Sequence, residues 1–260
     1  MADAGSRRIC GSAALISTSK VRASARKVEP LEHRDQSLHL SEPSDQRAEG
    51  RPAVRPGLRL GILLSGRGSN FLAIARSIRQ GRLPGVEIAI VVSNVADAAG
   101  ISVAAQLGLP HAVLVSKGRP RAEHDADVIA CLRRHKVDLV CLAGYMRLLS
   151  PQFIAAFPDR ILNIHPSLLP AFPGLDAQQQ AFDYGVQVAG CTVHFVDEHL
   201  DHGVIVLQRA IPVLASDDAH SLAERLLAEE HIAYTEAIAR VAGGAYELRG
   251  RRYVKRMTGV

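Results

Sequence analysis

The sequence has 260 residues, of which 47% are hydrophobic, so it can bury the core of one large α/β domain or of two small ones. Its formal net charge of +5 comes from its ends: residues 1–57 hold ten Lys or Arg against seven Asp or Glu, and residues 247–260 hold five against one. Because the segment between them is net acidic, we expect no nucleic-acid partner, and no apolar run approaches the ~18 residues of a membrane span.

The four cysteines are far apart and include no C-x-x-C pair, so they indicate neither a disulfide framework nor a zinc knuckle. Cys141 and Cys191 lie in strand-like runs and are interpreted as small buried hydrophobic residues. We therefore expect a soluble protein of a reducing compartment, the cytoplasm.

Residues 1–57 are rich in Ser, Ala, Arg and Pro and have only one short apolar run, so we expect a disordered extension. The first 28 residues hold six basic groups and one acid, a pattern that is also typical of an organelle transit peptide. An unstructured tail is the interpretation that we favour.

Five apolar runs of strand length follow from Leu58 onward, over residues 58–65, 86–93, 111–115, 137–145 and 160–165. Helices are expected between them, near 69–80, 97–107, 120–135 and 151–157. Continuous apolar strands that alternate with helices are typical of a parallel sheet covered on both faces, so the pattern predicts a Rossmann-like α/β fold.

The last part of the chain predicts a different arrangement. After a short helix over 177–185, the runs 188–196 and 203–213 are joined by a polar loop and predict an antiparallel hairpin that finishes the sheet. A long helix follows, with Ser216 or Asp217 as its N-cap and Gly243 and Gly244 as its end.

The motif SGRGSNF, residues 65–71, follows the first strand and opens a helix. Its glycines allow a sharp turn, and Ser69 and Asn70 could cap the helix, whose free N–H groups would then face an anion. Phe71 stands where a dinucleotide fingerprint has its third glycine, so a small phosphate group fits better than a nicotinamide cofactor. A plain strand-to-helix turn is the alternative.

Two further segments follow the fourth and fifth strands. In AGYMRLLSP, residues 143–151, Met146, Leu148 and Leu149 around Arg147 could line a slot for a flat ring, although core packing would explain them equally well. In NIHPSLLPAFPG, residues 163–174, an amide and an imidazole two residues apart share one face of the strand. Such a pair can stabilise an oxyanion while moving a proton, although a lone histidine is more often structural.

The hairpin loop HFVDEHLDHG, residues 194–203, is crowded with acids and histidines. The spacing of His194, His199 and His202 matches no zinc pattern, so no metal is expected. Asp201 is a candidate to fold back against the histidine of the preceding motif and fix its orientation.

Five motifs in this order resemble the phosphoribosylglycinamide formyltransferases, the folate-dependent transformylases of purine synthesis. They are GRGSN, SNxADAxG (93–100), LAGYMRLLSP, LNIHPSLLPAFPG and HFVDEHLDHGVIVLQ, within a match from about Leu58 to Leu248. The resemblance implies formyl transfer from 10-formyltetrahydrofolate to the amine of glycinamide ribonucleotide. It also implies one formyltransferase domain over 58–260, with a phosphate-binding half at about 58–160 and a folate and catalytic half at about 161–248.

The resemblance implies a role for each matching residue. Asn163 and protonated His165 would stabilise the oxyanion, His165 would protonate the leaving folate nitrogen, and Asp201 would help to move protons. The ribonucleotide would be bound by Gly68, Ser69, Asn70 and Glu230. The folate would be bound by Arg121, Met146, Arg147, Leu148, Leu149, Asn163, Asp197, Glu198, His199, Leu200 and Asp201.

Some positions depart from the family's bacterial pattern. Leu227 stands where a phosphate-contacting glutamine can occur, and Asp176 and Gln178 stand where histidines can occur. Pro166 directly follows the candidate catalytic histidine, where the related formyltetrahydrofolate deformylases tend to have a second histidine. A deformylase and a non-catalytic folate or nucleotide binder are the alternatives; the expected partners are small molecules, and the expected state is a monomer or a homodimer.

Overall fold

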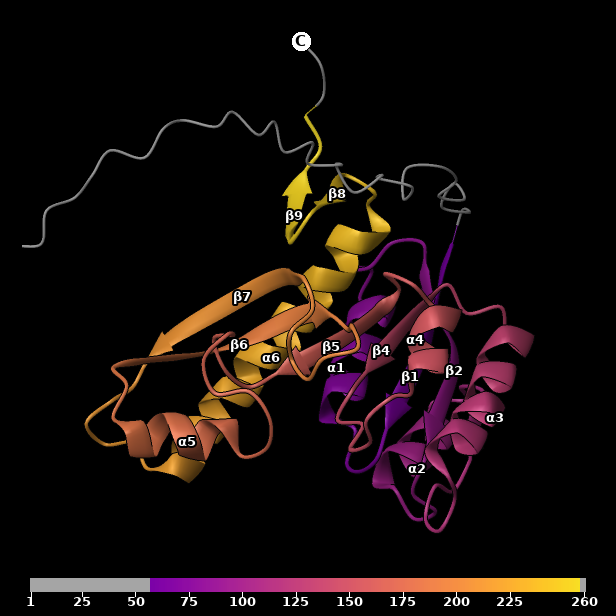
Figure 1. Ribbon diagram of the computed structural model, residues 1–260, viewed down its shortest axis with the longest axis horizontal. Helices are drawn as coiled ribbons and strands as arrows, with labels where there is room; N and C mark the ends of the chain where they lie inside the picture. The colour runs from indigo at the N-terminus through magenta and orange to yellow at the C-terminus, as the bar shows by residue number, and fades with distance from the viewer. Residues whose placement is uncertain (1–56, 258–260) are drawn as a thin grey trace, which may run out of the picture. The chain divides into compact units, whose positions relative to one another are not determined.

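The computed structural model describes residues 57–257 (Figure 1). The extension expected over residues 1–57 lies outside the described residues apart from Gly57, and so do the last three residues of the chain.

A seven-stranded sheet forms the centre of the described part, in the order β3-β2-β1-β4-β5-β6-β7. Its strands are β1 (Leu58–Leu64), β2 (Val86–Ser93), β3 (His111–Val113), β4 (Leu139–Leu142), β5 (Ile161–His165), β6 (Val188–Phe195) and β7 (Ile205–Pro212). All neighbours from β3 to β5 pair in parallel, whereas β6 and β7 pair antiparallel. The expected fold, a mostly parallel sheet completed by a hairpin, is confirmed.

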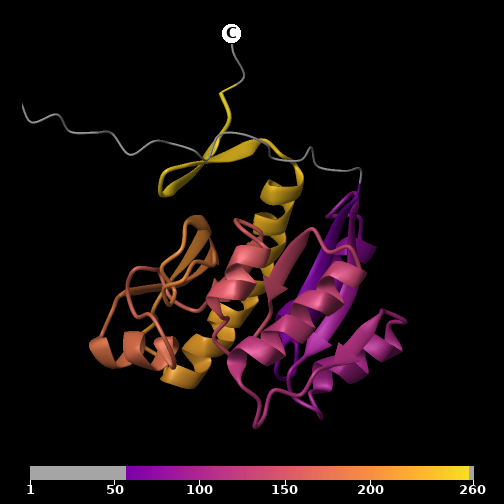
Figure 2. The same cartoon turned by 45° about the vertical axis from the view of Figure 1, so that its right-hand side comes forward.

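Helices cover both faces of the sheet (Figures 1 and 2). They are α1 (Ser69–Arg79), α2 (Ala99–Gln106), α3 (Arg121–Arg134), α4 (Pro151–Ala156), α5 (Ala177–Tyr184) and α6 (Ala219–Ala242). Side chains of α1, α2 and α6 share one core cluster with β1, whereas those of α3 and α4 share a second cluster with β2 and β4. The apolar runs of the strands are continuous because both faces of the sheet are buried.

The two predicted helix caps were placed wrongly. Helix α1 is capped by Gly68, whose φ of 73° is left-handed, and neither Ser69 nor Asn70 caps it through a side chain. Helix α6 is capped by Asp218, one residue beyond the expected pair, in a reciprocal capping box with Ser221. The predicted end at Gly243 is confirmed, since it is the C-cap of α6.

The basic C-terminal segment forms a second, two-stranded sheet that sequence analysis did not predict. Its strands are β8 (Tyr246–Arg249) and β9 (Arg252–Lys255), which lie beyond the end of α6 (Figure 2). Tyr253 packs edge-on against Phe195 with ring centroids 5.5 Å apart, so the hairpin rests on the end of β6.

Two further expectations concern the cysteines and membranes. Cys141 and Cys191 are fully buried, and burial raises the pKa of each thiol to about 12, so both are neutral hydrophobic residues as predicted. Among the described residues, no helix combines the length and apolar character needed to cross a membrane.

Candidate active site

The site lies where the parallel strands β1, β4 and β5 end at the same edge of the sheet, the usual position for ligands in such folds. Ser65 links two of these ends. Its backbone N–H donates to the Gly144 carbonyl at 3.0 Å, and its hydroxyl accepts from the Met146 N–H at 2.8 Å. The loop after β4 is thereby held against the turn that opens α1.

His165 is buried at the last position of β5 and is held from both sides of its ring. Its Nε2 lies 2.8 Å from the Phe172 carbonyl oxygen, which can only accept, so this nitrogen carries a proton. Its Nδ1 lies 3.4 Å from the Asp201 carboxylate. Both ring nitrogens of His165 thus face an oxygen atom that can accept a hydrogen bond.

Asp201 reaches this position from the loop between β6 and β7. Burial by itself would raise the pKa of its carboxyl, but interactions with His194, the Gly174 N–H and His165 lower that pKa below its ordinary value. The Gly174 N–H donates to Asp201 at 2.8 Å. The backbone of Asp201 has a φ of 49°, a left-handed conformation that is uncommon outside glycine and that aspartate tolerates better than most residues.

Asn163 is oriented by a histidine that sequence analysis did not include in the site. The register of β5 and β6 places Asn163 directly opposite His194. His194 Nδ1 donates to the Phe195 carbonyl at 2.9 Å, and its Nε2 lies 3.2 Å from the Asn163 side-chain nitrogen. His194 Nε2 also lies 3.7 Å from Asp201, so the four side chains form one cluster.

A glycine allows this loop to fold back over the end of β6. A Cβ on Gly203 would lie 1.7 Å from the Phe195 carbonyl oxygen, so no other residue fits without moving the backbone. This close approach fixes where the loop returns, two residues after Asp201.

The residues expected to bind the ribonucleotide lie on α1 and α6. The Asn70 amide donates to the Glu230 carboxylate at 2.9 Å, and both residues are buried. Burial raises the pKa of Glu230, and the hydrogen bond from Asn70 lowers it by less. One turn later, the Tyr234 hydroxyl contacts the Leu142 and Leu162 carbonyls at 3.1 and 2.9 Å, which fixes α6 against β4 and β5.

The residues expected to bind folate lie in two different environments. Met146 and Leu148 are exposed after β4, whereas Leu149 is partly buried against the second core cluster. Arg147 donates to the Arg119 carbonyl at 3.2 Å. The remaining expected residues are solvent-exposed or partly buried. Arg121 lies at the start of α3, and the loop after β6 holds Asp197, Glu198, His199 and Leu200.

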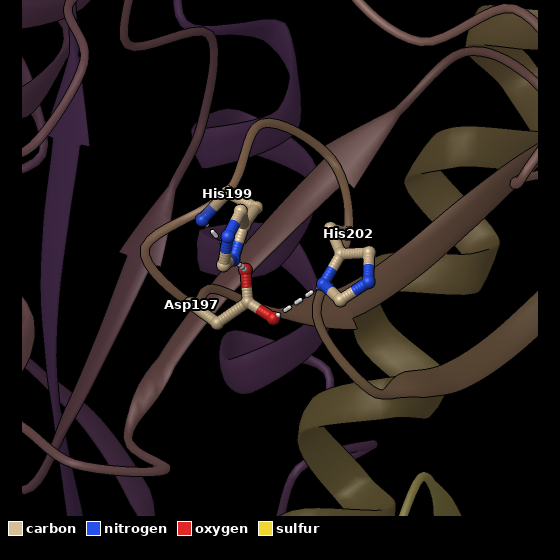
Figure 3. Close-up of side chains that lie close together, drawn as sticks. All are labelled: Asp197, His199 and His202. Atoms are coloured by element: carbon tan, nitrogen blue, oxygen red, sulfur yellow. Dashed lines mark hydrogen bonds and ion pairs between the residues drawn. The ribbon is translucent and has the colours of Figure 1, made fainter.

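Within the described residues, one group has metal-ligating chemistry: Asp197, His199 and His202 (Figure 3). Their ligand atoms all lie within 4.8 Å of one another. Burial tends to raise the pKa of Asp197, but the neighbouring His202 and the His199 N–H lower it below its ordinary value, so the carboxylate is charged. His194 belongs to the Asn163 cluster and not to this group.

Comparisons with known proteins identify the family of this chain. Residues 58–238 match the formyl transferase family. The chain belongs to that family. The matched segment runs from the first residue of β1 into α6, so it includes every strand of the main sheet and all four side chains of the buried cluster.

Relatives within the formyl transferase family include single enzymes and parts of larger proteins. The chain is 38% identical to phosphoribosylglycinamide formyltransferase of Escherichia coli, covering 72% of this chain and 88% of that protein. It is 43% identical to the trifunctional purine biosynthetic protein adenosine-3 of Drosophila pseudoobscura pseudoobscura, over 75% of this chain. It spans only 14% of the length of that larger relative.

A solved structure supports the same assignment. Glycinamide ribonucleotide transformylase 1 from Symbiobacterium toebii is 50% identical, with a TM-score of 0.74, and the match covers 76% of this chain and 94% of that one. The formyl transferase fold of this chain is therefore that of the transformylases.

Proposed function

We propose that this chain transfers the formyl group of 10-formyltetrahydrofolate to the amine of N1-(5-phospho-D-ribosyl)glycinamide, a step of purine synthesis. The observation that carries the proposal is the buried cluster at the end of β5, where His165 lies 3.4 Å from Asp201 beside Asn163. Similarity supports the same proposal, because the relatives of this chain include the phosphoribosylglycinamide formyltransferase of Escherichia coli.

In the proposed reaction, the substrate amine attacks the formyl carbon and the formyl oxygen becomes an oxyanion. An amide N–H of Asn163 and the protonated ring of His165 stabilise that charge, because preorganised donors are most effective where charge develops. For this, the His165 Nε2–H turns from the Phe172 carbonyl to the substrate. The tetrahedral carbon then loses the folate nitrogen, which accepts a proton from His165. Asp201 orients the His165 ring and accepts, through water, the proton that leaves the substrate amine; passing this proton to the now neutral His165 restores both groups.

Two sets of residues position the substrates in this proposal. The turn of Gly68, Ser69 and Asn70 presents the N-terminus of α1 to the ribonucleotide phosphate, and Glu230 contacts the same substrate. The folate lies against Met146, Arg147, Leu148 and Leu149 on one side and the loop from Asp197 to Asp201 on the other, with Arg121 near its outer end. Leu227 supplies no polar group, so the phosphate depends on the turn at α1.

We also propose that the enzyme acts in the cytoplasm, as a monomer or a homodimer, on small-molecule substrates alone. The absence of disulfides among Cys131, Cys141 and Cys191, the described cysteines, supports a reducing compartment.

The test is to incubate the purified full chain with 10-formyltetrahydrofolate, with and without glycinamide ribonucleotide, and to follow loss of the formyl group. We expect loss only when the ribonucleotide is present, with formylated product in equal amount. Equal loss in both reactions would instead identify a deformylase that uses water as acceptor. No loss in either, with folate still bound, would identify a non-catalytic binder.

A further inference from the structure

The loop between β6 and β7 carries a D-x-H-x-x-H pattern on its outer side, formed by Asp197, His199 and His202. Asp197 lies between the two rings (Figure 3). Its carboxylate is 2.9 Å from His202 Nδ1 and 4.0 Å from His199 Nδ1, and the ring centroids of the two histidines are 5.1 Å apart. The side chains of His199 and His202 are 76% and 51% exposed, so a solvated ion could reach them directly.

We propose that Asp197, His199 and His202 form a binding site for a divalent transition-metal ion, with zinc as the reference ion. Two imidazoles and one carboxylate are a donor set that suits Zn²⁺ and leaves a fourth position for water. None of the matched family motifs or predicted site roles assigns a metal to this loop.

The geometry requires only small side-chain movements for such a site. Zn²⁺ binds imidazole nitrogen and carboxylate oxygen at about 2.0–2.2 Å, so tetrahedral ligand atoms are separated by roughly 3.4 Å. The three ligand atoms already lie within 4.8 Å of one another. The His199 backbone N–H donates to Asp197 at 2.9 Å, which keeps the carboxylate folded toward the loop.

Arg251 opposes metal binding and provides a sharp test of the proposed geometry. One of its guanidinium nitrogens lies 3.2 Å from His202 Nε2 and 3.4 Å from His202 Nδ1, and the other donates to the His202 carbonyl at 2.6 Å. The positive charge of Arg251 therefore lies beside both nitrogens through which His202 could bind a metal ion. Metal binding through either nitrogen has to overcome this charge and displace the contact with Arg251.

The expected consequence for catalysis rests on the proposed function. His199 and His202 flank Asp201 in the chain, and His199 belongs to the loop that is proposed to bind folate. An ion that draws both rings toward Asp197 would remove His199 from the folate and restrain the loop. We expect metal occupancy to raise KM for 10-formyltetrahydrofolate several-fold while kcat changes less.

Metal binding is measured first, without any assay of activity. The full chain is freed of metal with a chelator and titrated with Zn²⁺ by calorimetry, and Co²⁺ is added in parallel to record the absorption bands of a tetrahedral site. We expect His199→Gln and His202→Gln each to weaken binding by more than the roughly 10–100-fold that loss of an outer-shell partner costs. Arg251→Gln should strengthen it, because both the charge and the competing hydrogen bond are gone.

His220→Gln is the matched control, since His220 is an exposed histidine near an acid, Glu224, on another element, α6. His33, His39 and Cys10 remain in every variant and contribute the same background. The site is refuted if the wild type and His202→Gln bind the same number of Zn²⁺ ions with the same affinity. Weaker binding after Arg251→Gln would also contradict it. An inactive enzyme that still binds zinc through these residues would refute the proposed function alone.

Discussion

The loop between β6 and β7 contributes an aspartate to each of two histidine clusters, which have opposite environments. In the inner cluster the side chains of His165 and Asp201 are 6% and 8% exposed, whereas in the outer cluster those of His199, His202 and Asp197 are 76%, 51% and 39% exposed. A carboxylate and an imidazole thus meet twice within a few residues. Only the inner pair is shielded from water, which is the condition under which charge interactions are strong.

The difference arises from what lies opposite each residue. The inner cluster forms because β5 and β6 pair antiparallel, which brings Asn163 against His194, and because Gly203 returns the loop over Phe195. The three residues of the outer cluster come from a single loop, and Arg251 from the turn between β8 and β9 lies against His202. The inner site is therefore preorganised by the sheet, whereas the outer site rests on contacts within its loop and with this turn.

The largest effect should follow from Asp201→Asn. The substitution keeps the shape and the Gly174 N–H contact but removes the negative charge that faces His165 Nδ1. We expect kcat to fall by about 10²–10⁴, the range attributed to general acid–base catalysis, with substrate dissociation constants nearly unchanged. Single-turnover formyl transfer and equilibrium binding measure the two quantities separately; a near-normal rate would remove Asp201 from the mechanism.

The same variant should respond differently to acid. Because the folded pKa of Asp201 is lowered, its ionised form stabilises the wild type above the ordinary carboxyl pKa, and this stability is lost as pH falls through the folded value. Asp201→Asn lacks this contribution at every pH. The gap in unfolding free energy between wild type and variant should therefore close on acidification, as urea denaturation at several pH values would show.

A smaller effect is expected from His194→Gln. Glutamine can still lie opposite Asn163, but it does not reproduce a ring that contacts the Asn163 amide at 3.2 Å and the Phe195 carbonyl at 2.9 Å at the same time. We expect kcat to fall by about tenfold, and stability to fall by about 1–3 kcal/mol, the cost of an unsatisfied buried group. Steady-state kinetics and urea denaturation test this, with His220→Gln as the control; a stability loss with unchanged kcat would mean that His194 only supports the fold.

Glu230→Gln should raise the stability of the fold and weaken binding of the ribonucleotide. Because burial holds the pKa of Glu230 above its ordinary value, ionisation opposes folding, and wild-type stability falls as pH rises from the ordinary value to the folded one. Above that window the variant should melt higher by a few degrees, since about 1 kcal/mol shifts Tm by ~2–4 °C in a domain of this size.

The same variant should have a raised KM for the ribonucleotide, with the KM for folate unchanged. Melting curves at several pH values and steady-state kinetics check both parts. A lower Tm above the window would show that the Asn70 contact outweighs the desolvation of the carboxylate.

Much of the fold could be predicted because each parallel strand is a continuous apolar run, as in β2, which was placed at its observed bounds. The cap of α6 was missed by one residue because Ser216, Asp217 and Asp218 are all good capping residues and only the capping box with Ser221 decides between them. The strands β8 and β9 were missed because each has only four residues, two of them charged, in a basic segment at the end of the chain.

The site was less accessible to sequence reasoning than the fold. Asn163 and His165 stood out because a strand of period two puts both on one face. His194 did not, because its role depends on the strand register across β5 and β6. The available signal was that His194 opens the run HFVDEHLDHG, which is crowded with acids and histidines. Sequence analysis considered His194 only as a metal ligand. The grouping of Asp197, His199 and His202 was missed for a similar reason, because it depends on how the loop folds.

The smallest effect is expected from His202→Gln in metal-free buffer. His202 is exposed, contacts neither His165 nor Asn163 through any described hydrogen bond, and lies outside the proposed folate site. Its loss removes a half-exposed hydrogen bond with Asp197, and exposed polar pairs of this kind contribute about 0–1 kcal/mol. Without metal, we expect kcat and KM of the variant to lie within about twofold of the wild-type values. Added Zn²⁺ should raise the folate KM of the wild type but leave that of the variant unchanged. Steady-state kinetics with and without Zn²⁺ measure this, and equal inhibition of both proteins would place the inhibitory ion elsewhere.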